Sequence, residues 1–165
     1  MILVDSSVWI DYFRSVDTRQ VALLDTLFGH TPLAVGDLIA AEVLQGVRDE
    51  KAFKWVKRTL DAFEHVDLCG YDLAVRAAEN YRALQAKGVT IRSTIDCVIA
   101  QLCLRDGQAL LAKDRDFDRI AELTKLKLVE VDSALSQLMR LRTTHEPLDD
   151  LGIPRVGTSR QRGKA

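Results

Sequence analysis

Short apolar runs alternate with longer segments of helical periodicity along this chain. Five runs predict buried strands, and they comprise residues 2–4, 33–35, 66–68, 109–112 and 128–131. Between them, apolar residues recur every three to four positions and predict helices over residues 8–13, 21–28, 37–45, 51–63, 73–86, 95–105 and 118–123. Four of these helices end at a glycine, namely Gly29, Gly46, Gly88 and Gly107. Strands that alternate with helices indicate an α/β fold with a central, mostly parallel sheet and right-handed crossovers.

Length and composition favour one domain followed by a tail of different character. The 165 residues are 47% hydrophobic, which suffices to bury one core. Residues 151–165 contain four basic residues, three glycines and no acidic residue. We therefore expect a domain over residues 1–142 and a basic, disordered tail over residues 143–165, interpreted as an idle extension more readily than as an RNA contact. The overall charge of −1 leaves −5 on residues 1–150, which weakens a purely electrostatic case for nucleic-acid binding.

Several classes of protein are excluded or disfavoured by features that the chain lacks. The first apolar run ends after four residues, no basic stretch precedes it, and no run of about 18 apolar residues follows. We therefore expect a cytoplasmic protein without a membrane segment. The three cysteines form no C-x-x-C pair and the three histidines have no paired spacing, which argues against a zinc site or a disulfide framework. Glycine-rich nucleotide-binding loops are absent as well.

Carboxylates occupy the positions where the predicted strands end. Asp5 directly follows the first predicted strand, and Asp114 and Asp116 follow the run 109–112. Because the carboxyl ends of parallel strands meet at one edge of a sheet, we expect these acids to share that edge.

Two further acids lie on predicted helices. Glu42 falls inside the apolar arc of its helix, one turn beyond Leu38. Asp96 lies at the edge of an apolar stripe, in the first turn of a helix that Thr94 can cap. A buried carboxylate must protonate, pair with a counter-charge or bind a cation.

Each of these acids also has an ordinary structural explanation. Asp5 can cap the helix that follows it, Asp96 can complement a helix dipole, and Asp116 can cap the segment 117–123. Capping does not predict the inward Glu42, however, and four separate elements each supply an acid. The whole set therefore predicts a cation site.

Motifs that contain these acids occur in a fixed order along the chain. They are Ile2-Leu3-Val4-Asp5-Ser6-Ser7-Val8-Trp9-Ile10-Asp11, then Glu42 in a helix after a short strand, then Thr94-Ile95-Asp96-Cys97-Val98-Ile99-Ala100, and finally Leu111-Ala112-Lys113-Asp114-Arg115-Asp116-Phe117. Together they resemble the motifs of PIN-domain nucleases, especially the VapC toxins of bacterial toxin–antitoxin pairs, over about residues 1–140. The resemblance implies a PIN-like three-layer α/β/α fold. By the same resemblance, Ser7 corresponds to the hydroxyl that supports the first aspartate, and Asp116 to an accessory acid. The family's acidic quartet corresponds to Asp5, Glu42, Asp96 and Asp114.

The acids and the resemblance together predict a metal-dependent endoribonuclease that hydrolyses RNA phosphodiester bonds. Carboxylate oxygens without imidazole or thiolate select Mg²⁺, for which Mn²⁺ can substitute. The expected metal ligands are Asp5, Asp96 and Asp114. Glu42 would bind a second ion or accept a proton from the attacking water, and Asp116 would do either more weakly.

The resemblance further implies an RNA substrate, a cognate VapB-like antitoxin and a homodimer. Basic residues near the acids are candidate phosphate contacts, although each taken alone is more simply a solvated charge; they are Arg14, Arg48, Arg92, Lys113 and Arg115. Trp9 and Tyr12 can stack on bases, but core packing is the favoured interpretation.

Three other functions remain open. A housekeeping PIN nuclease in RNA processing would carry the same acids. A haloacid-dehalogenase-like phosphatase requires an aspartate where this chain has Ser7. A receiver domain, which is a non-enzymatic Mg²⁺-binding regulator, requires a phosphorylatable aspartate after the third strand, and Asp67 is the one candidate for that position.

Overall fold

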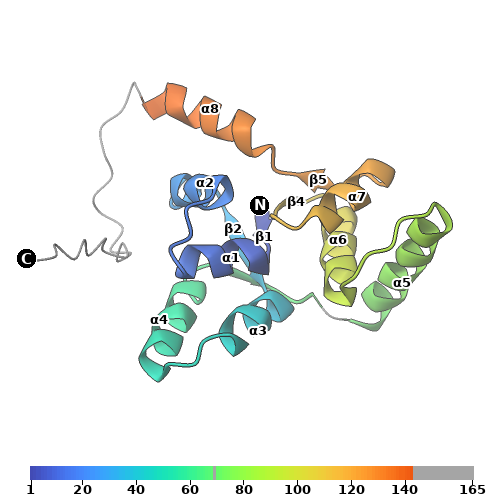
Figure 1. The fold of residues 1–165 in the computed structure, drawn as a ribbon, viewed down its shortest axis with the longest axis horizontal. Helices are drawn as coiled ribbons and strands as arrows, with labels where there is room; N and C mark the ends of the chain where they lie inside the picture. The colour runs from blue at the N-terminus through green and yellow to red at the C-terminus, as the bar shows by residue number, and fades with distance from the viewer. Residues whose placement is uncertain (69, 143–165) are drawn as a thin grey trace, which may run out of the picture.

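A parallel sheet forms the centre of the computed structural model, which describes residues 1–68 and 70–142 (Figure 1). The strands in this part of the chain are β1 (Ile2–Val4), β2 (Leu33–Gly36), β3 (Glu64–Val66), β4 (Ala109–Leu111) and β5 (Lys127–Leu128). They lie in the order β3-β2-β1-β4-β5, and every neighbouring pair is parallel. This confirms the predicted parallel α/β sheet, with the first strand of the chain at its centre.

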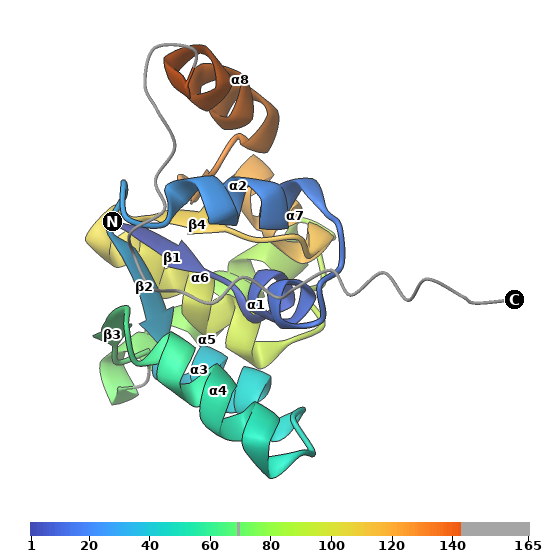
Figure 2. The same ribbon diagram turned by 90° about the vertical axis from the view of Figure 1, so that its left-hand side faces the viewer.

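Helices cover both faces of the sheet, as Figures 1 and 2 show. The connections from β1 to β2 and from β2 to β3 contain α1 (Ser6–Phe13), α2 (Arg19–Leu27), α3 (Asp37–Gln45) and α4 (Glu50–Leu60). The connections to β4 and β5 contain α5 (Tyr71–Ala86), α6 (Thr94–Asp106) and α7 (Arg115–Leu123). Because the two groups of crossovers run in opposite directions along the sheet, right-handed connections place them on opposite faces. The result is the expected three-layer α/β/α fold.

The segment after β5 differs from the prediction. The apolar run predicts a strand over residues 128–131, whereas the structure has β5 at Lys127–Leu128 and then the helix α8 (Val131–Arg142), which the sequence pattern did not predict. Figure 2 shows α8 beside α2, and an exposed ion pair joins Arg19 to Asp132 with 2.6 Å between Nη1 and Oδ1. The apolar residues at the start of α8 were therefore assigned to the wrong element.

The third strand also lies earlier than predicted. It covers Glu64–Val66 rather than 66–68, and as an edge strand it exposes its first two side chains. Leu68 is fully buried, but beyond the strand, where its side chain packs against Gly36. The buried Leu68 thus belongs to the segment after the strand and not to the strand itself.

The core lies between the sheet and both helix layers. Helix α6 is buried along much of its length, from Cys97 to Cys103, and both of these cysteines are free thiols in the core, as expected. Trp9 is fully buried among aromatic rings of α1 and of the segments that follow α2 and α4, so core packing, and not base stacking, is its role. The third cysteine and the predicted tail over residues 143–165 lie outside the described residues.

Within residues 1–68 and 70–142, no helix combines the length and the apolar character needed to cross a lipid bilayer.

Candidate active site

The sheet has a topological switch point between β1 and β4. From β1 the chain first builds β2 and β3 on one side, and later β4 and β5 on the other. In open parallel sheets, ligands bind at such a point, outside the carboxyl ends of the strands. Asp5 directly follows β1 and its backbone N–H donates to the carbonyl of Leu111, the last residue of β4, at 2.9 Å. Asp5 and the nearby Asp114 therefore share this edge.

Asp5 caps a helix and also interacts electrostatically with another acid of the site. Its Oδ2 accepts hydrogen bonds from the Ser7 backbone N–H at 2.9 Å and from Ser7 Oγ at 2.5 Å, so Asp5 caps α1. Only 3% of the residue is exposed. Burial raises the pKa of Asp5, the bonds from Ser7 partly offset that effect, and the charge of Glu42 adds to it. The structure therefore confirms that Asp5 caps α1, and it also places the carboxylate within the electrostatic influence of Glu42.

Asp96 lies in the first turn of α6. The cap of this helix is Ser93 and not the predicted Thr94, since Ser93 Oγ accepts from the Asp96 backbone N–H at 3.3 Å. Burial and then the charge of Asp5 raise the pKa of Asp96 to about 7; Ser93 opposes this, and Asp114 and Glu42 add to it. The other three acids of the predicted quartet thus all lie within electrostatic range of Asp96.

Glu42 reaches the site from α3. Its side chain is half-buried, between the buried Ile39 and Val43 along the helix, which is less inward than the apolar arc predicted. The start of α3 is fixed by Asp37, whose Oδ1 accepts from the backbone N–H groups of Leu38 at 2.7 Å and Leu68 at 2.9 Å. Glu42 therefore projects from a helix that is anchored at its end nearest the sheet.

Asp114 and Asp116 have different surroundings. Asp114 caps α7, so the helix begins at Arg115, earlier than predicted, and the cap is not Asp116. Asp116 is 2% exposed, and its carboxylate faces Arg92 and Arg119. Burial acts to raise the pKa of Asp116, but the hydrogen bonds and charge of Arg92 hold it below its usual value. The carboxylate of Asp116 is therefore ionised, and the two arginines balance its negative charge.

The pairing of Arg92 with Asp116 was not predicted from the sequence. The residue was one of five candidate phosphate contacts, and its partner Asp116 lies 24 positions away along the chain. Of the other candidates, Lys113 donates through Nζ to Asp11 Oδ2 at 2.6 Å, which ties the segment before Asp114 to α1. Arg14, Arg48 and Arg115 are exposed.

The chemistry of the acids suits a hard divalent cation. The quartet offers carboxylate oxygens alone, and a cation would offset both the burial and the repulsion from Asp5 that raise the pKa of Asp96. In the part of the chain that the structure describes, however, no three His, Cys, Asp or Glu side chains are gathered in an arrangement that could hold a metal ion. The other acids thus act electrostatically on Asp96, but the described side chains do not form a closed cage.

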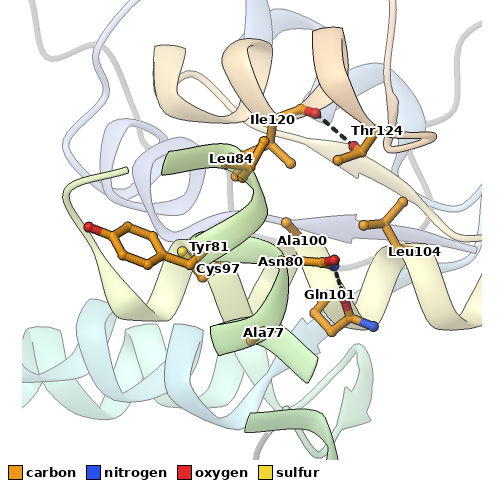
Figure 3. A pocket seen from close by; sticks show the side chains of 10 residues that line it. All are labelled: Ala77, Asn80, Tyr81, Leu84, Cys97, Ala100, Gln101, Leu104, Ile120 and Thr124. Carbon is orange, nitrogen blue, oxygen red and sulfur yellow. Dashed lines mark hydrogen bonds between the residues drawn. The ribbon is translucent and has the colours of Figure 1, made fainter. Parts of the chain in front are cut away.

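A small cavity elsewhere is not a second candidate for the active site. It lies between α5, α6 and α7, with room for about one water molecule, and Figure 3 shows its mainly apolar lining. A hydrogen bond joins Asn80 Nδ2 to Gln101 Oε1 across it. None of the five predicted acids lines this cavity.

The strand order argues against the receiver-domain alternative. In receiver-type sheets the third strand pairs with the first, which brings its phosphorylatable aspartate to the acids after the first strand. Here β3 pairs with β2 at the edge of the sheet, so a whole strand separates Asp67 from Asp5.

Comparison with known proteins agrees with this fold. Residues 2–123 match the family model of the PIN domain, and the chain belongs to the PIN-domain family. Within it the chain is VapC-like: it is 33% identical over 129 residues to ribonuclease VapC11 of Mycobacterium tuberculosis, an alignment that covers 77% of this chain and 96% of that protein.

Solved toxin–antitoxin complexes contain the same fold. VapBC-1 from nontypeable Haemophilus influenzae has a TM-score of 0.62 at 15% identity, and the match covers 80% of this chain and 99% of that one. VapBC2 from Rickettsia felis, bound to a DNA fragment from its promoter, has a TM-score of 0.59 at 21% identity, covering 78% of this chain and 97% of that one.

Proposed function

We propose that this protein is a metal-dependent endoribonuclease that hydrolyses RNA phosphodiester bonds, and that it acts as the toxin of a VapBC-type toxin–antitoxin pair. The observation that carries the proposal is that Asp5, Asp114 and Glu42 all lie near Asp96 at the switch point, where burial and then their charges raise the pKa of Asp96 to about 7. Membership of the PIN-domain family and the likeness to a ribonuclease named VapC support the choice of RNA as substrate.

The residues of the site have separate tasks in this reaction. A bound Mg²⁺ or Mn²⁺ would supply charge neutralisation at the phosphate and lower the pKa of the attacking water. Asp5, Asp96 and Asp114 would hold the ion directly or through its bound waters, and Ser7 keeps Asp5 oriented through its two hydrogen bonds. Glu42 lies on the helix after β2, which is on the opposite side of β1 from β4. It would accept the proton of the attacking water or hold a second ion.

The proposal includes the partners of such a toxin. The structural neighbours named above are VapBC complexes, which supports a cognate VapB-like antitoxin for this chain. A homodimer and action in the cytoplasm, where RNA substrates are present, belong to the same proposal. A housekeeping PIN nuclease would have the same site but no toxic effect, so growth assays distinguish the two.

Cleavage of total cellular RNA by the purified protein tests the enzymatic part. The wild type is incubated with Mg²⁺ or Mn²⁺, beside Asp96→Asn and the matched control Asp72→Asn, which removes an exposed acid from the first turn of α5 in the same way. We expect discrete fragments from the wild type and from Asp72→Asn, and none from Asp96→Asn or after addition of EDTA. Equal cleavage by Asp96→Asn, or full cleavage in EDTA, would contradict the proposed site.

A further inference from the structure

The buried carboxylate of Asp116 joins the segments that carry two of the predicted metal ligands. Its Oδ2 accepts from the Arg92 backbone N–H at 3.1 Å and from Arg92 Nε at 3.2 Å. Its own backbone N–H donates to Asp114 Oδ1 at 2.9 Å. Arg92 directly precedes Ser93, the cap of the helix that carries Asp96. Asp116 therefore fixes the start of α6 against the start of α7.

The guanidinium of Arg92 is held at its base and exposed at its end. Nε is bound to Asp116, while Nη2 lies 3.3 and 3.5 Å from the two oxygens of Asp114, which are long contacts. Although both acids touch it, 74% of the side chain is exposed. Arginine has five N–H donors in a planar fork, so the outer edge of the group has donors left for a ligand beside Asp114.

We propose that Arg92 binds a backbone phosphate of the RNA at the edge of the acidic site, and that Asp116 is the positioning residue that orients it. This inference rests on the proposed function and deepens it, since it names a substrate contact. An anchored guanidinium suits a phosphate because its fork matches two phosphate oxygens, and because the bond from Nε to a buried acid fixes its direction in advance.

The geometry distinguishes Asp116 from the four other acids. A carboxylate that ligates an ion needs an open oxygen, whereas both oxygens of Asp116 face arginines, Arg92 on Oδ2 and Arg119 on Oδ1, the latter at 3.5 Å. The residue is also almost completely buried. Asp116 therefore acts on the substrate through Arg92, in place of the accessory role among the acids that the sequence suggested.

The salt dependence of RNA binding tests the phosphate contact. Fluorescence anisotropy of a labelled, unstructured single-stranded RNA is measured across a range of KCl concentrations with Mg²⁺ present, with every variant in an Asp96→Asn background to prevent cleavage. Loss of one phosphate contact should make the slope of log affinity against log salt shallower by about 0.7. We expect this change for Arg92→Ala and not for Arg76→Ala, which removes an exposed arginine of α5. Equal slopes for these two variants would overturn the inference, since a merely structural role does not alter the slope.

A double-mutant cycle in the cleavage-competent protein tests the role of Asp116. Asp116→Asn should raise KM about tenfold with little change in kcat, and should add little further effect in an Arg92→Ala background. An independent loss of kcat in that background would show instead that Asp116 takes part in the reaction directly. If Asp116→Asn fails to fold, Arg92→Lys replaces it: the retained charge should preserve the slope, and loss of the fork should weaken affinity.

The two proposals can fail separately. A wild type that binds RNA with an Arg92-dependent slope but cleaves no RNA would refute the proposed function and support the phosphate contact. A wild type that cleaves RNA while Arg92→Ala matches Arg76→Ala in slope and KM would refute the phosphate contact alone.

Discussion

Asp96→Asn should stabilise the metal-free protein at alkaline pH, although it destroys the proposed active site. In the folded chain, burial and the neighbouring Asp5 raise the pKa of Asp96 from 3.8 to about 7. In the unfolded chain the carboxyl ionises near its ordinary pKa of about 4. As pH rises from about 4 to about 7, the unfolded state loses this proton first, so the wild type loses stability across that range. The neutral asparagine avoids this loss and keeps the same shape.

The size of the effect follows from the pKa difference. A rise from 3.8 to about 7 corresponds to about 4 kcal/mol when taken at face value. Asp96 is only partly buried, and solvent screening reduces this to about 2 kcal/mol. For a domain of this size, that difference raises Tm by about 6 °C.

Urea denaturation in EDTA measures this difference. Wild type, Asp96→Asn and the control Asp72→Asn are compared at about pH 4.5 and about pH 8, on either side of the folded pKa. The advantage of Asp96→Asn should be small at the lower pH and near its full value at the higher one, and Asp72→Asn should show no such growth. Addition of Mg²⁺ should then stabilise the wild type more than Asp96→Asn, because the ion binds the folded state. A pH-independent difference, or a wild type that is the more stable protein at pH 8 in EDTA, would refute the reasoning.

Three further predictions concern the frame of the site and the biological role. Gly36→Ala should lower stability by about 1–3 kcal/mol in urea denaturation, because the new Cβ would lie 2.4 Å from Cδ1 of the fully buried Leu68; unchanged stability would mean that Leu68 moves aside freely. Asp11→Asn removes the partner of Lys113 and should slow RNA cleavage several-fold while costing about 1 kcal/mol or less in stability; full activity would show that this ion pair does not orient the segment before Asp114. Induced expression of the wild type in bacteria should stop growth, Asp96→Asn should not, and a co-expressed cognate antitoxin should restore growth; normal growth with wild type would favour a housekeeping nuclease.

The elements predicted best are those whose residues are buried on both sides. The central strands β1, β2 and β4 are short apolar runs because helices cover both faces, and the acids Asp5 and Asp114 mark where the first and last of them end. At the edges this signal fails. Strand β3 exposes side chains, and β5 passes within three residues into α8, so apolar positions beyond the strands were counted as parts of them.

The acids of the candidate site could be proposed from the sequence, but the arginine partners of Asp116 could not. Asp5, Glu42 and Asp96 could be found because each lies at a fixed place within a periodic element. The bond between Arg92 and Asp116 joins the ends of different helices, with all of α6 and β4 between them in the chain. Neither periodicity nor spacing carries information about such a contact, and only the fold brings the two residues together.

The position of β1 between β2 and β4 has a consequence for the timing of activity during synthesis. Asp5 is synthesised well before Asp114, which follows β4, and β4 can join β1 only after the elements between them have been made. Contacts between such distant parts of a chain form late in folding. A nascent chain therefore lacks a complete set of these acids at the edge of the sheet until β4 has been made and has paired with β1.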